Sequence, residues 1–358
     1  MTTPLRVLIA GGGTGGHVVP ALAIARELRD AHSAQVRLLG TARGIESKLV
    51  PAAGFPLDLI HVGQLANVSL TTRIKTLFDL PRGVLHCITL LRDFRPQVVI
   101  GVGGYASGPA MLAALLLRIP TMVYEPNAAP GMVNRFVGRY VNAAAVAFEE
   151  TKPLFRHAQV TGVPVRREVF ATGPLPLDHP RLLITAGSNG AKVFNETLPL
   201  IATALLQQVP GLTILHQTGE RAYATTTAAY SEHNVDTAAI EVRPFIDDMP
   251  HQLDRATLVL ARSGSTVAEL AAAGRPALLV PFPQAADDHQ TRNAEAMVRI
   301  GAAQLLPQSQ LTPETLLQQL LHLFHDPQIL LQMATNAWAA AKPNALQQIA
   351  SLAIHLAQ

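Results

Sequence analysis

The glycine-rich turn near the N-terminus limits the possible folds of this chain more than any other stretch. Residues 6–10 form a short apolar run typical of a buried parallel strand, residues 11–16 are almost all glycine, and residues 21–28 have an apolar helical face. This order makes an anion site, because glycine lets the backbone approach closely and N–H groups at the helix start point at a phosphate. The sequence therefore predicts a nucleotide-type α/β fold.

The same turn matches the dinucleotide fingerprint, with glycine at positions 11, 13 and 16. A dinucleotide site also needs an acidic residue at the end of the next strand, where it binds the ribose hydroxyls. Here the next apolar run, residues 35–39, is followed by Gly40 and Thr41. We therefore expect a phosphate site that does not bind NAD.

Length and composition fit two globular domains. The chain has 358 residues, of which 49% are apolar and 15% charged. It has no run of 18 apolar residues and no secretory signal before the first strand, so neither a membrane span nor secretion is expected. A single cysteine, Cys87, excludes a disulfide framework and favours a reducing cytoplasm. The net charge of +3 argues against a dedicated nucleic-acid binder.

Alternating apolar runs and helical patterns predict two parallel sheets. In the first half, strands are expected at residues 6–10, 35–39, 57–60, 97–101, 121–124, 143–147 and 158–161. After a proline-rich segment the strand–glycine–helix opening recurs, with strands expected at residues 182–185, 212–216, 240–242, 258–261 and 277–280. We expect two doubly wound, Rossmann-like domains that face a central cleft, with a boundary near residues 162–166 and ligands at the carboxyl ends of the strands.

Residues 64–94 interrupt this pattern with apolar and basic side chains. A pair of amphipathic helices packed on the sheet would explain the composition. The alternative is a surface that binds an anionic membrane. The residues alone leave both interpretations open.

Three groups in the first half are candidates for chemistry. His17 follows the first glycine turn, and a helix N-terminus favours the neutral imidazole of a general base; a histidine that only hydrogen-bonds the turn is the alternative. A second glycine loop at residues 101–109 suggests a ligand with a diphosphate, or with a phosphate and a sugar. Glu125 and Asn127 end another strand and could bind hydroxyls or act as acid and base, unless they only cap a turn.

The second half offers candidates for a nucleotide-sugar site. Ser188 lies in a small-residue turn suited to a pyrophosphate, and residues 262–269 open a helix whose backbone could hold a phosphate or uracil. Glu269 could accept hydrogen bonds from two ribose hydroxyls, although a surface glutamate is the alternative. Gln290 and Asn293 could contact a sugar. No D-x-D motif occurs and adjacent aspartates point to opposite faces of an extended chain, so no metal site is expected.

These motifs, in this order, resemble those of the MurG family of peptidoglycan N-acetylglucosaminyltransferases. The segments that carry the resemblance are GGGTGGH at 11–17, LGTARGIESKLVP at 39–51, GVGGYASGP at 101–109, YEPN at 124–127, GVPVR at 162–166, AGSNGA at 186–191, FIDDM at 245–249, RSGSTVAELAAAGRPALLVPFP at 262–283 and DDHQTRNA at 287–294. Each motif alone is weak, whereas the ordered set covers nearly the whole chain and is highly specific.

The resemblance implies a GT-B fold and an inverting transfer that needs neither metal nor cofactor. N-acetylglucosamine would pass from UDP-N-acetylglucosamine to the C4 hydroxyl of the muramoyl sugar of lipid I, which carries an undecaprenyl diphosphate, and the product would be lipid II. Residues 1–163 would bind lipid I and face the membrane, residues 164–343 would bind the donor, and residues 344–358 would be a helix that returns to the first domain.

The resemblance also implies where the protein works. The apolar and basic segment at residues 64–94 would contact an anionic membrane. The protein would then lie peripherally on the cytoplasmic face of the bacterial inner membrane, with cell-wall synthesis and cell-division proteins as partners.

By position, the resemblance implies roles for individual residues. His17 would be the general base, and Glu125 and Asn127 would be further catalytic residues. The residues at the acceptor diphosphate would be Gly13, Thr14, Gly103, Gly104 and Tyr105. Those that contact the donor would be Thr14, Gly15, Gly16, His17, Asn127, Arg166, Ser188, Ile246, Ser265, Thr266, Glu269 and Gln290. Within the donor, Arg166 and Ser188 would hold the phosphates, Ile246 the uracil, Glu269 the ribose and Gln290 the sugar.

The chain departs from the family pattern in four places. The family usually has HEQN at 124–127, GNPVR at 162–166 and GGSQGA at 186–191, and its RSGAxTxxE turn is one residue longer than residues 262–269. The shorter turn could alter donor affinity or selectivity, but the retained His17, Asn127, Arg166 and Glu269 favour an active transferase. The alternatives are a GT-B enzyme with another lipid acceptor, a UDP-sugar epimerase, an NAD-dependent oxidoreductase and a non-catalytic scaffold of cell-wall assembly.

Overall fold

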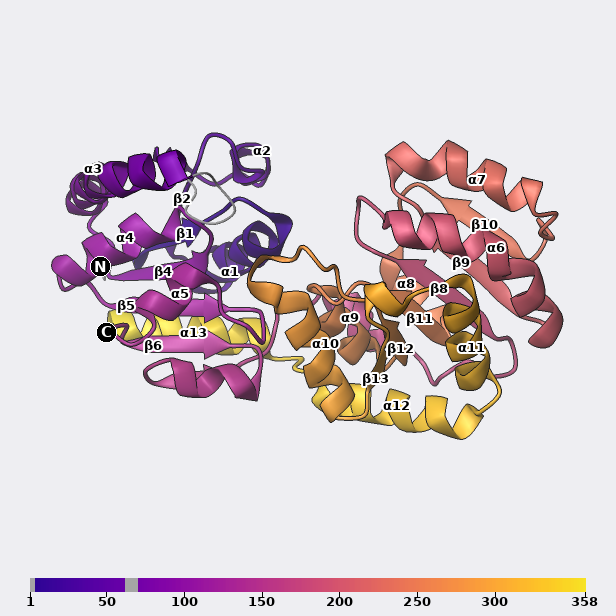
Figure 1. Cartoon of the computed structure of the whole chain (residues 1–358). Coiled ribbons are helices and arrows are strands. Elements are labelled where there is room, and N and C mark those ends of the chain that lie inside the picture. The colour runs from indigo at the N-terminus through magenta and orange to yellow at the C-terminus, as the bar shows by residue number, and fades with distance from the viewer. Residues whose placement is uncertain (1–3, 62–69) are drawn as a thin grey trace. The chain divides into compact units, whose positions relative to one another are not determined.

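The computed structural model describes residues 4–61 and 70–358, and its description of side chains resumes at residue 79. The chain forms two compact units. Unit 1 comprises Met1–Pro164 and Asn344–Gln358, and unit 2 comprises Val165–Pro343. Each unit is built on one sheet of parallel strands (Figure 1). The expected fold class, two Rossmann-like α/β domains, is confirmed.

The sheet of unit 1 has seven strands in the order β3-β2-β1-β4-β5-β6-β7. They are β1 Arg6–Gly11, β2 Gln35–Gly40, β3 Leu57–Leu59, β4 Val98–Gly103, β5 Thr121–Glu125, β6 Ala143–Val146 and β7 Ala158–Val160. The chain runs outward from β1 to β3 and then returns to place β4 beside β1, so the order reverses between β1 and β4. Ligands of open parallel sheets bind at such a switch point, and both glycine loops of unit 1 follow these two strands.

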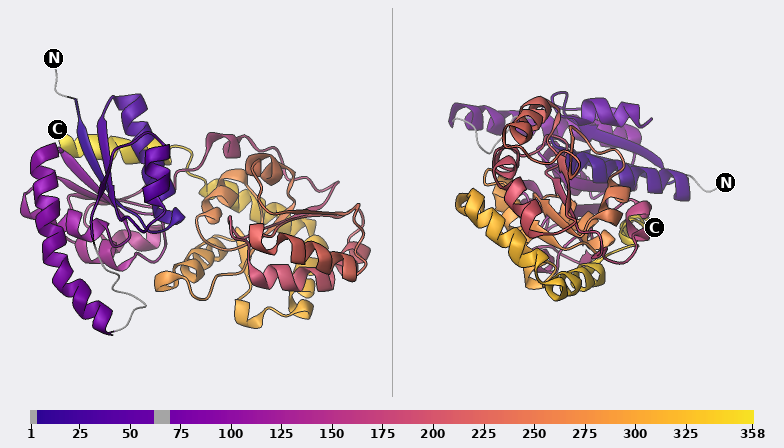
Figure 2. Two further views of the ribbon diagram at one scale, coloured as in Figure 1. Left: turned by 90° about the horizontal axis from the view of Figure 1, so that it is seen from above. Right: turned by 90° about the vertical axis from the view of Figure 1, so that its right-hand side faces the viewer.

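Helices cover both faces of this sheet because side chains alternate along the strands. Val7 and Ile9 of β1 point into one core with α1 (Gly15–His32) and α13 (Ala345–Ala357). Leu8 and Ala10 point into the other core, with α3 (Leu70–Phe94) and α4 (Ser107–Leu116). Figure 2 shows α13 and α3 on opposite faces of the sheet. The remaining helices of unit 1 are α2 Glu46–Ala52, α5 Met132–Val137 and the short 3-10 helix η1 Glu149–Leu154.

The sheet of unit 2 has six strands in the order β10-β9-β8-β11-β12-β13. They are β8 Arg181–Thr185, β9 Thr213–Gln217, β10 Ile240–Arg243, β11 Leu258–Ala261, β12 Ala277–Leu279 and β13 Ala303–Leu305. The switch point lies between β8 and β11. The helices are η2 Arg167–Ala171, α6 Lys192–Gln208, η3 Glu220–Ala222, α7 Tyr223–Glu232, α8 Met249–Arg255, α9 Thr266–Ala273, η4 Ala286–Asp288, α10 His289–Arg299, η5 Gln308–Gln310, α11 Pro313–Phe324 and α12 Pro327–Ala340.

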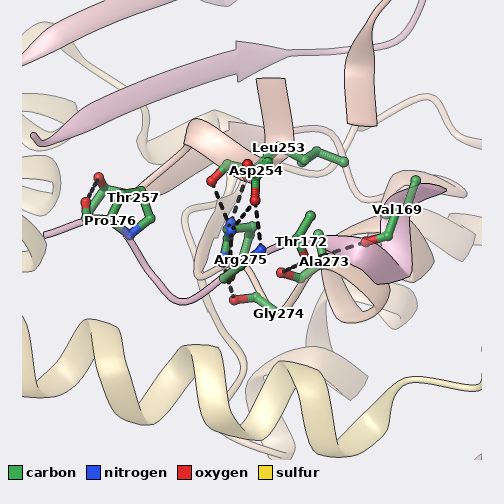
Figure 3. Close-up of polar contacts among 10 residues, drawn as sticks. Val169, Thr172, Pro176, Leu253, Asp254, Thr257, Ala273, Gly274 and Arg275 are labelled. Atoms are coloured by element: carbon green, nitrogen blue, oxygen red, sulfur yellow. Dashed lines mark hydrogen bonds and ion pairs between the residues drawn. The ribbon is translucent and has the colours of Figure 1, made fainter. Parts of the chain in front are cut away.

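A buried arginine ties together the segment that enters unit 2 and two of its helices (Figure 3). The Arg275 side chain, 2% exposed, donates from Nε to the carbonyl of Leu253 at 2.7 Å. Its Nη2 donates to the carbonyls of Gly173 at 3.0 Å and Asp254 at 2.9 Å. Leu253 and Asp254 lie in the last turn of α8, where carbonyls lack partners within the helix, so Arg275 caps α8.

Two details differ from the sequence prediction. A pair of helices was one of the two interpretations of residues 64–94, whereas the described part is a single helix, α3, which contains Pro81. Residues 62–69 lie outside the described residues. Strand β13 was not expected, because Ala303–Leu305 has only three residues and a central glutamine. In the described part of the chain, none of the helices combines the length and apolarity needed to span a bilayer.

Candidate active site

The two glycine loops of unit 1 are in direct backbone contact at the switch point. Gly12 N donates to the carbonyl of Gly103 at 3.4 Å. A Cβ at Gly104 would overlap the carbonyl oxygen of Gly12, and a Cβ at Gly11 would lie 2.6 Å from the carbonyl oxygen of Gly103. The glycines are therefore required by the close approach of two backbones, and the loops form one continuous surface.

His17, in the first turn of α1, lies against the second of these loops. A Cβ at Gly103 would come within 2.8 Å of His17 Cε1 and 2.9 Å of its Nδ1, and within 3.5 Å of Asn134 Nδ2. Gly103 has φ +94°, a conformation that favours glycine. The structure thus brings together His17 and the loop around Gly103, which sequence analysis proposed separately, and it adds Asn134, which sequence analysis did not single out.

Glu125 holds Asn127 and the loop that leads to α5. Its Oε1 accepts from Asn127 N at 3.0 Å and Asn127 Nδ2 at 3.2 Å. Its Oε2 accepts from Gly131 N at 3.2 Å and Asn134 Nδ2 at 3.0 Å. Burial raises the pKa of Glu125 to about 7, against the lowering effect of these four N–H donors. Because the side chain is 1% exposed and both oxygens are engaged, the geometry favours a positioning role over contact with substrate.

The N–H of Gly13 is also engaged within the protein. It donates to Glu46 Oε2 at 2.8 Å, which leaves the acceptor diphosphate that we expected at Gly13 without this donor. The neighbouring residues are better placed for a ligand. Thr14 precedes α1 without capping it through its side chain, and it is exposed. Tyr105 is half-buried just before α4.

In unit 2 the turn after β8 is held by the end of β9. Gln217 Nε2 donates to the carbonyl of Gly187 at 2.6 Å, and a Cβ at Gly190 would overlap the carbonyl oxygen of Thr218. Asn195, near the start of α6, donates from Nδ2 to the same carbonyl of Thr218 at 3.0 Å. These contacts leave Ser188 exposed at the tip of a well-anchored turn, as a phosphate-binding loop requires.

Arg166 and Glu269 form an ion pair. Arg166 precedes η2, and its Nη2 lies 3.4 Å from Oε1 of Glu269, in the first turn of α9. Burial raises the pKa of Glu269, and the charge and hydrogen bond of Arg166 oppose that rise. The residues assigned to the phosphates and to the ribose are therefore partners of each other.

A second arginine anchors the segment that follows β12. Arg262 donates from Nη1 to the carbonyls of Val280 at 2.9 Å and Pro281 at 2.8 Å. Its guanidinium lies 5.3 Å from the ring centroid of Phe194 and 5.5 Å from that of Phe282. Burial lowers the pKa of Arg262 to about 10. The sequence showed Arg262 only as part of a motif, because the partners of this side chain are distant in sequence.

The remaining donor candidates have different exposures. Gln290 Oε1 accepts from Phe282 N at 2.9 Å, so its oxygen holds the segment after β12. Ser265, before α9, is exposed, and Thr266 at the start of that helix is half-buried. The side chain of Ile246 is 3% exposed, so little of it is available to uracil in this structure.

Among the described residues, no group of three or more acidic, histidine or cysteine side chains is placed to hold a metal ion.

Two Rossmann-like units, each with anchored small-residue loops at its switch point, define a nucleotide-sugar enzyme of the GT-B class. Solved structures support this class. The glycosyltransferase of kitacinnamycin is similar with a TM-score of 0.76 and 16% identity, over 99% of this chain and 100% of that one, which shows the fold alone. MurG of Acinetobacter baumannii is similar with a TM-score of 0.84 and 36% identity, over 98% of this chain and 100% of that one.

Sequence comparison gives the family. The model of the glycosyltransferase family 28 N-terminal domain matches residues 7–146, and the model of its C-terminal domain matches residues 181–349. The UDP-N-acetylglucosamine--N-acetylmuramyl-(pentapeptide) pyrophosphoryl-undecaprenol N-acetylglucosamine transferase of Shewanella sp. (strain MR-4) is 41% identical over 99% of this chain and 98% of its own length. The chain therefore belongs to glycosyltransferase family 28, and within it to the MurG family.

Proposed function

We propose that this protein transfers N-acetylglucosamine from UDP-N-acetylglucosamine to the C4 hydroxyl of the muramoyl sugar of lipid I. The product is lipid II, the disaccharide precursor of peptidoglycan. The observation that carries the proposal is the full-length similarity to a relative whose name states this reaction, at 41% identity. The retained loops around His17 and Gly103 support it.

The reaction is a single displacement with inversion. The C4 oxygen of the acceptor attacks C1 of N-acetylglucosamine, the bond from C1 to the diphosphate oxygen breaks, and UDP leaves with the electron pair. His17 accepts the proton of the attacking hydroxyl, as a general base does. Its position in the first turn of α1, against Gly103, supports this assignment.

The acceptor diphosphate binds, in this proposal, at the loops after β1 and β4. Backbone N–H groups at the start of α1, from Gly15 and Gly16, lack partners within the helix and suit an anion. Thr14, Gly103, Gly104 and Tyr105 complete the acceptor site. Gly13 is left out, because its N–H is donated to Glu46. Thr14, Gly15, Gly16, His17 and Asn127 are also proposed to contact the donor sugar during transfer.

The donor nucleotide binds, in this proposal, in unit 2. Ser188 and Arg166 hold the diphosphate, Glu269 accepts hydrogen bonds from the ribose, and Ser265 and Thr266 offer N–H groups at the start of α9. Ile246 contacts uracil through its backbone, since its side chain is buried. Gln290 contacts the sugar through Nε2, since its oxygen accepts from Phe282 N.

Transfer of radiolabelled N-acetylglucosamine to a short-chain lipid I analogue tests both reaction and base. We expect His17→Ala to lower turnover by about 100-fold or more. His32→Ala, an exposed position at the other end of α1, is the matched control and should stay within about twofold of the wild type. Wild-type protein that binds the donor but transfers nothing would favour another acceptor or a scaffold role. Full turnover in His17→Ala would refute the role of His17 as the general base but would leave the proposed reaction standing.

We further propose that unit 1 lies peripherally on the cytoplasmic face of the inner membrane. The described part of residues 64–94 exposes Leu85 by 64% and the side chain of Arg82 by 82%. Helix α4 packs on α3 and α5 packs on α4, and these two add Leu116, 69% exposed, and Phe136, 64% exposed. Met132 lies one turn before Phe136 on the same face of α5, and the neighbouring Arg135 is exposed too. Apolar side chains beside arginines suit an anionic bilayer.

Vesicle flotation tests this membrane proposal. Wild-type protein should float with vesicles that contain anionic phospholipid and not with neutral ones, and Phe136→Ser with Arg135→Glu should abolish flotation. Equal flotation of the variant would place the membrane contact elsewhere. Partners from cell-wall synthesis and cell division are proposed from the family alone.

A further inference from the structure

The buried carboxylate of Glu46 contacts the first glycine loop. It is the first residue of α2, and its side chain is 1% exposed. Oε2 accepts from Gly13 N at 2.8 Å, in the loop after β1. Oε1 accepts from Thr41 N at 2.8 Å and from Thr41 Oγ1 at 2.9 Å, in the loop after β2. One carboxylate therefore joins two loops that are distant in sequence.

Three glycines make room for this carboxylate. A Cβ added at Gly12, at Gly40 or at Gly44 would overlap the side chain of Glu46, and in each case the nearest three atoms all belong to it. None of the three glycines has a positive φ, so an alanine could adopt the same backbone. Their lack of a side chain is explained by the space that Glu46 occupies.

The carboxylate is held in its ionised form. Burial alone would raise the pKa of Glu46, but hydrogen bonds from the backbone of Gly13 and Thr41 and from the Thr41 hydroxyl lower it overall. Charge-assisted hydrogen bonds of this kind are about twice as strong as neutral ones. An ionised group with three engaged donors is therefore a strong link between the loops.

We propose that Glu46 is a positioning residue for catalysis, which clamps the loop after β1 and so fixes the start of α1. Gly13 is followed directly by Thr14, which precedes α1, and by His17 in its first turn. A loop that is fixed at Gly13 holds His17 in place against Gly103. This inference rests on the proposed function of His17 as the base, and it adds a residue that touches neither substrate.

The test compares Glu46→Gln with Glu27→Gln, a half-buried glutamate on α1 that undergoes the same change of charge. In Glu46→Gln one acceptor oxygen becomes an NH2 group that faces the donors of Gly13 or Thr41. We expect its kcat to fall about 10-fold or more and its acceptor KM to rise by a larger factor than its donor KM. Glu27→Gln should match the wild type within about twofold.

Hydrogen exchange followed by mass spectrometry gives a readout that does not depend on the reaction. Amides in residues 12–17 and 41–46 of Glu46→Gln should exchange faster, while those of β1 and β4 keep their protection. Faster exchange throughout unit 1 would mean that Glu46 only stabilises the fold, and it would overturn the proposal. A wild-type enzyme that transfers no sugar would instead refute the proposed function, and local exchange would still report on the clamp.

A double-mutant cycle distinguishes the clamp from general damage. Gly44→Ala should impair turnover about as much as Glu46→Gln, because its methyl group would displace the carboxylate. In a Glu46→Ala background the methyl has space, so Gly44→Ala should cost less than about twofold more. Additive losses would show that Gly44 is needed for another reason and would overturn this account of the glycines.

Discussion

Arg166 Nη2 lies 3.4 Å from Glu269 Oε1, so two side chains that we assign to different parts of the donor form an ion pair with each other. Bound UDP would compete for both partners. We expect Glu269→Gln to weaken uridine and UDP alike, by about 10-fold or more, because hydrogen bonds to a charged group are lost. Arg166→Ala should weaken UDP by a similar factor and leave uridine binding unchanged or tighter. Isothermal titration calorimetry measures both.

The control for this pair is Arg292→Ala, which removes another partly exposed ion pair, with Glu295, in the same unit. It should leave both affinities within about twofold. If Arg166→Ala weakens uridine as much as UDP, then Arg166 does not contact the phosphates and only supports Glu269.

Gly103→Ala should impair catalysis through His17. The new methyl group would lie 2.8 Å from His17 Cε1, so the imidazole must move, and a displacement of about 1 Å at a catalytic group can cost about 100-fold in kcat. Gly54→Ala is the control in the same unit. Gly54 also has a positive φ, +75°, which strains an alanine, but no atom lies within 4 Å of its added Cβ. Equal kcat values for the two variants would attribute the loss to strain.

Arg275→Leu should destabilise unit 2 by about 3 kcal/mol. It removes the donor from the carbonyls of buried Leu253, half-buried Asp254 and exposed Gly173, and a buried group left unsatisfied costs about 1–3 kcal/mol. Trp338 is the only tryptophan of the chain and packs beside Gly274, so its fluorescence reports the unfolding of unit 2 in urea. Arg292→Ala, on the surface, should change the free energy of unfolding by less than about 0.5 kcal/mol. A comparable loss in both variants would contradict the capping role of Arg275.

Glu125 should make the stability of unit 1 depend on pH. Its pKa in the folded protein is about 7, against 4.5 for an ordinary glutamate, so between these values the folded state binds more protons than the unfolded state. The free energy of unfolding should therefore fall as the pH rises from about 5 to 7, by at most about 3 kcal/mol. Scanning calorimetry from pH 5 to 8 measures this slope, and Glu125→Gln should flatten it. If Glu125→Gln leaves the dependence of the free energy of unfolding on pH unchanged, another titratable group causes that dependence.

Much of the fold was predictable because buried parallel strands are short apolar runs. The strand predicted at residues 258–261 matches β11, and β1 extends the prediction of 6–10 by one residue. The missed strand β13 has too little apolar pattern to stand out. The described part of residues 64–94 is one helix, α3, which continues through Pro81, although a proline in a helix interior usually ends or kinks the helix.

The sequence predicted which loops form the candidate site, but it did not predict which side chains within the site contact each other. Glycine turns after strands identified the loops around His17 and Gly103, because local backbone demands are visible in local sequence. The engagement of Gly13 by Glu46 was not visible, since 33 residues separate the two. The pairing of Arg166 with Glu269 spans 103 residues and depends on how the strands are ordered in the sheet.

The position of α13 has a consequence for how the protein is made. Ile349, Ala350 and Ala353 of this helix complete the core that covers Val7 and Ile9. Figure 1 shows α13, in yellow, beside the strands of unit 1. A growing chain leaves the ribosome from its N-terminus, so the sheet of unit 1 emerges long before the helix that covers one of its faces. Unit 2, which is continuous in sequence, is complete first. We expect unit 1 to finish folding only after residues 344–358 have left the ribosome, and the part of its core that α13 covers to be exposed to chaperones until then.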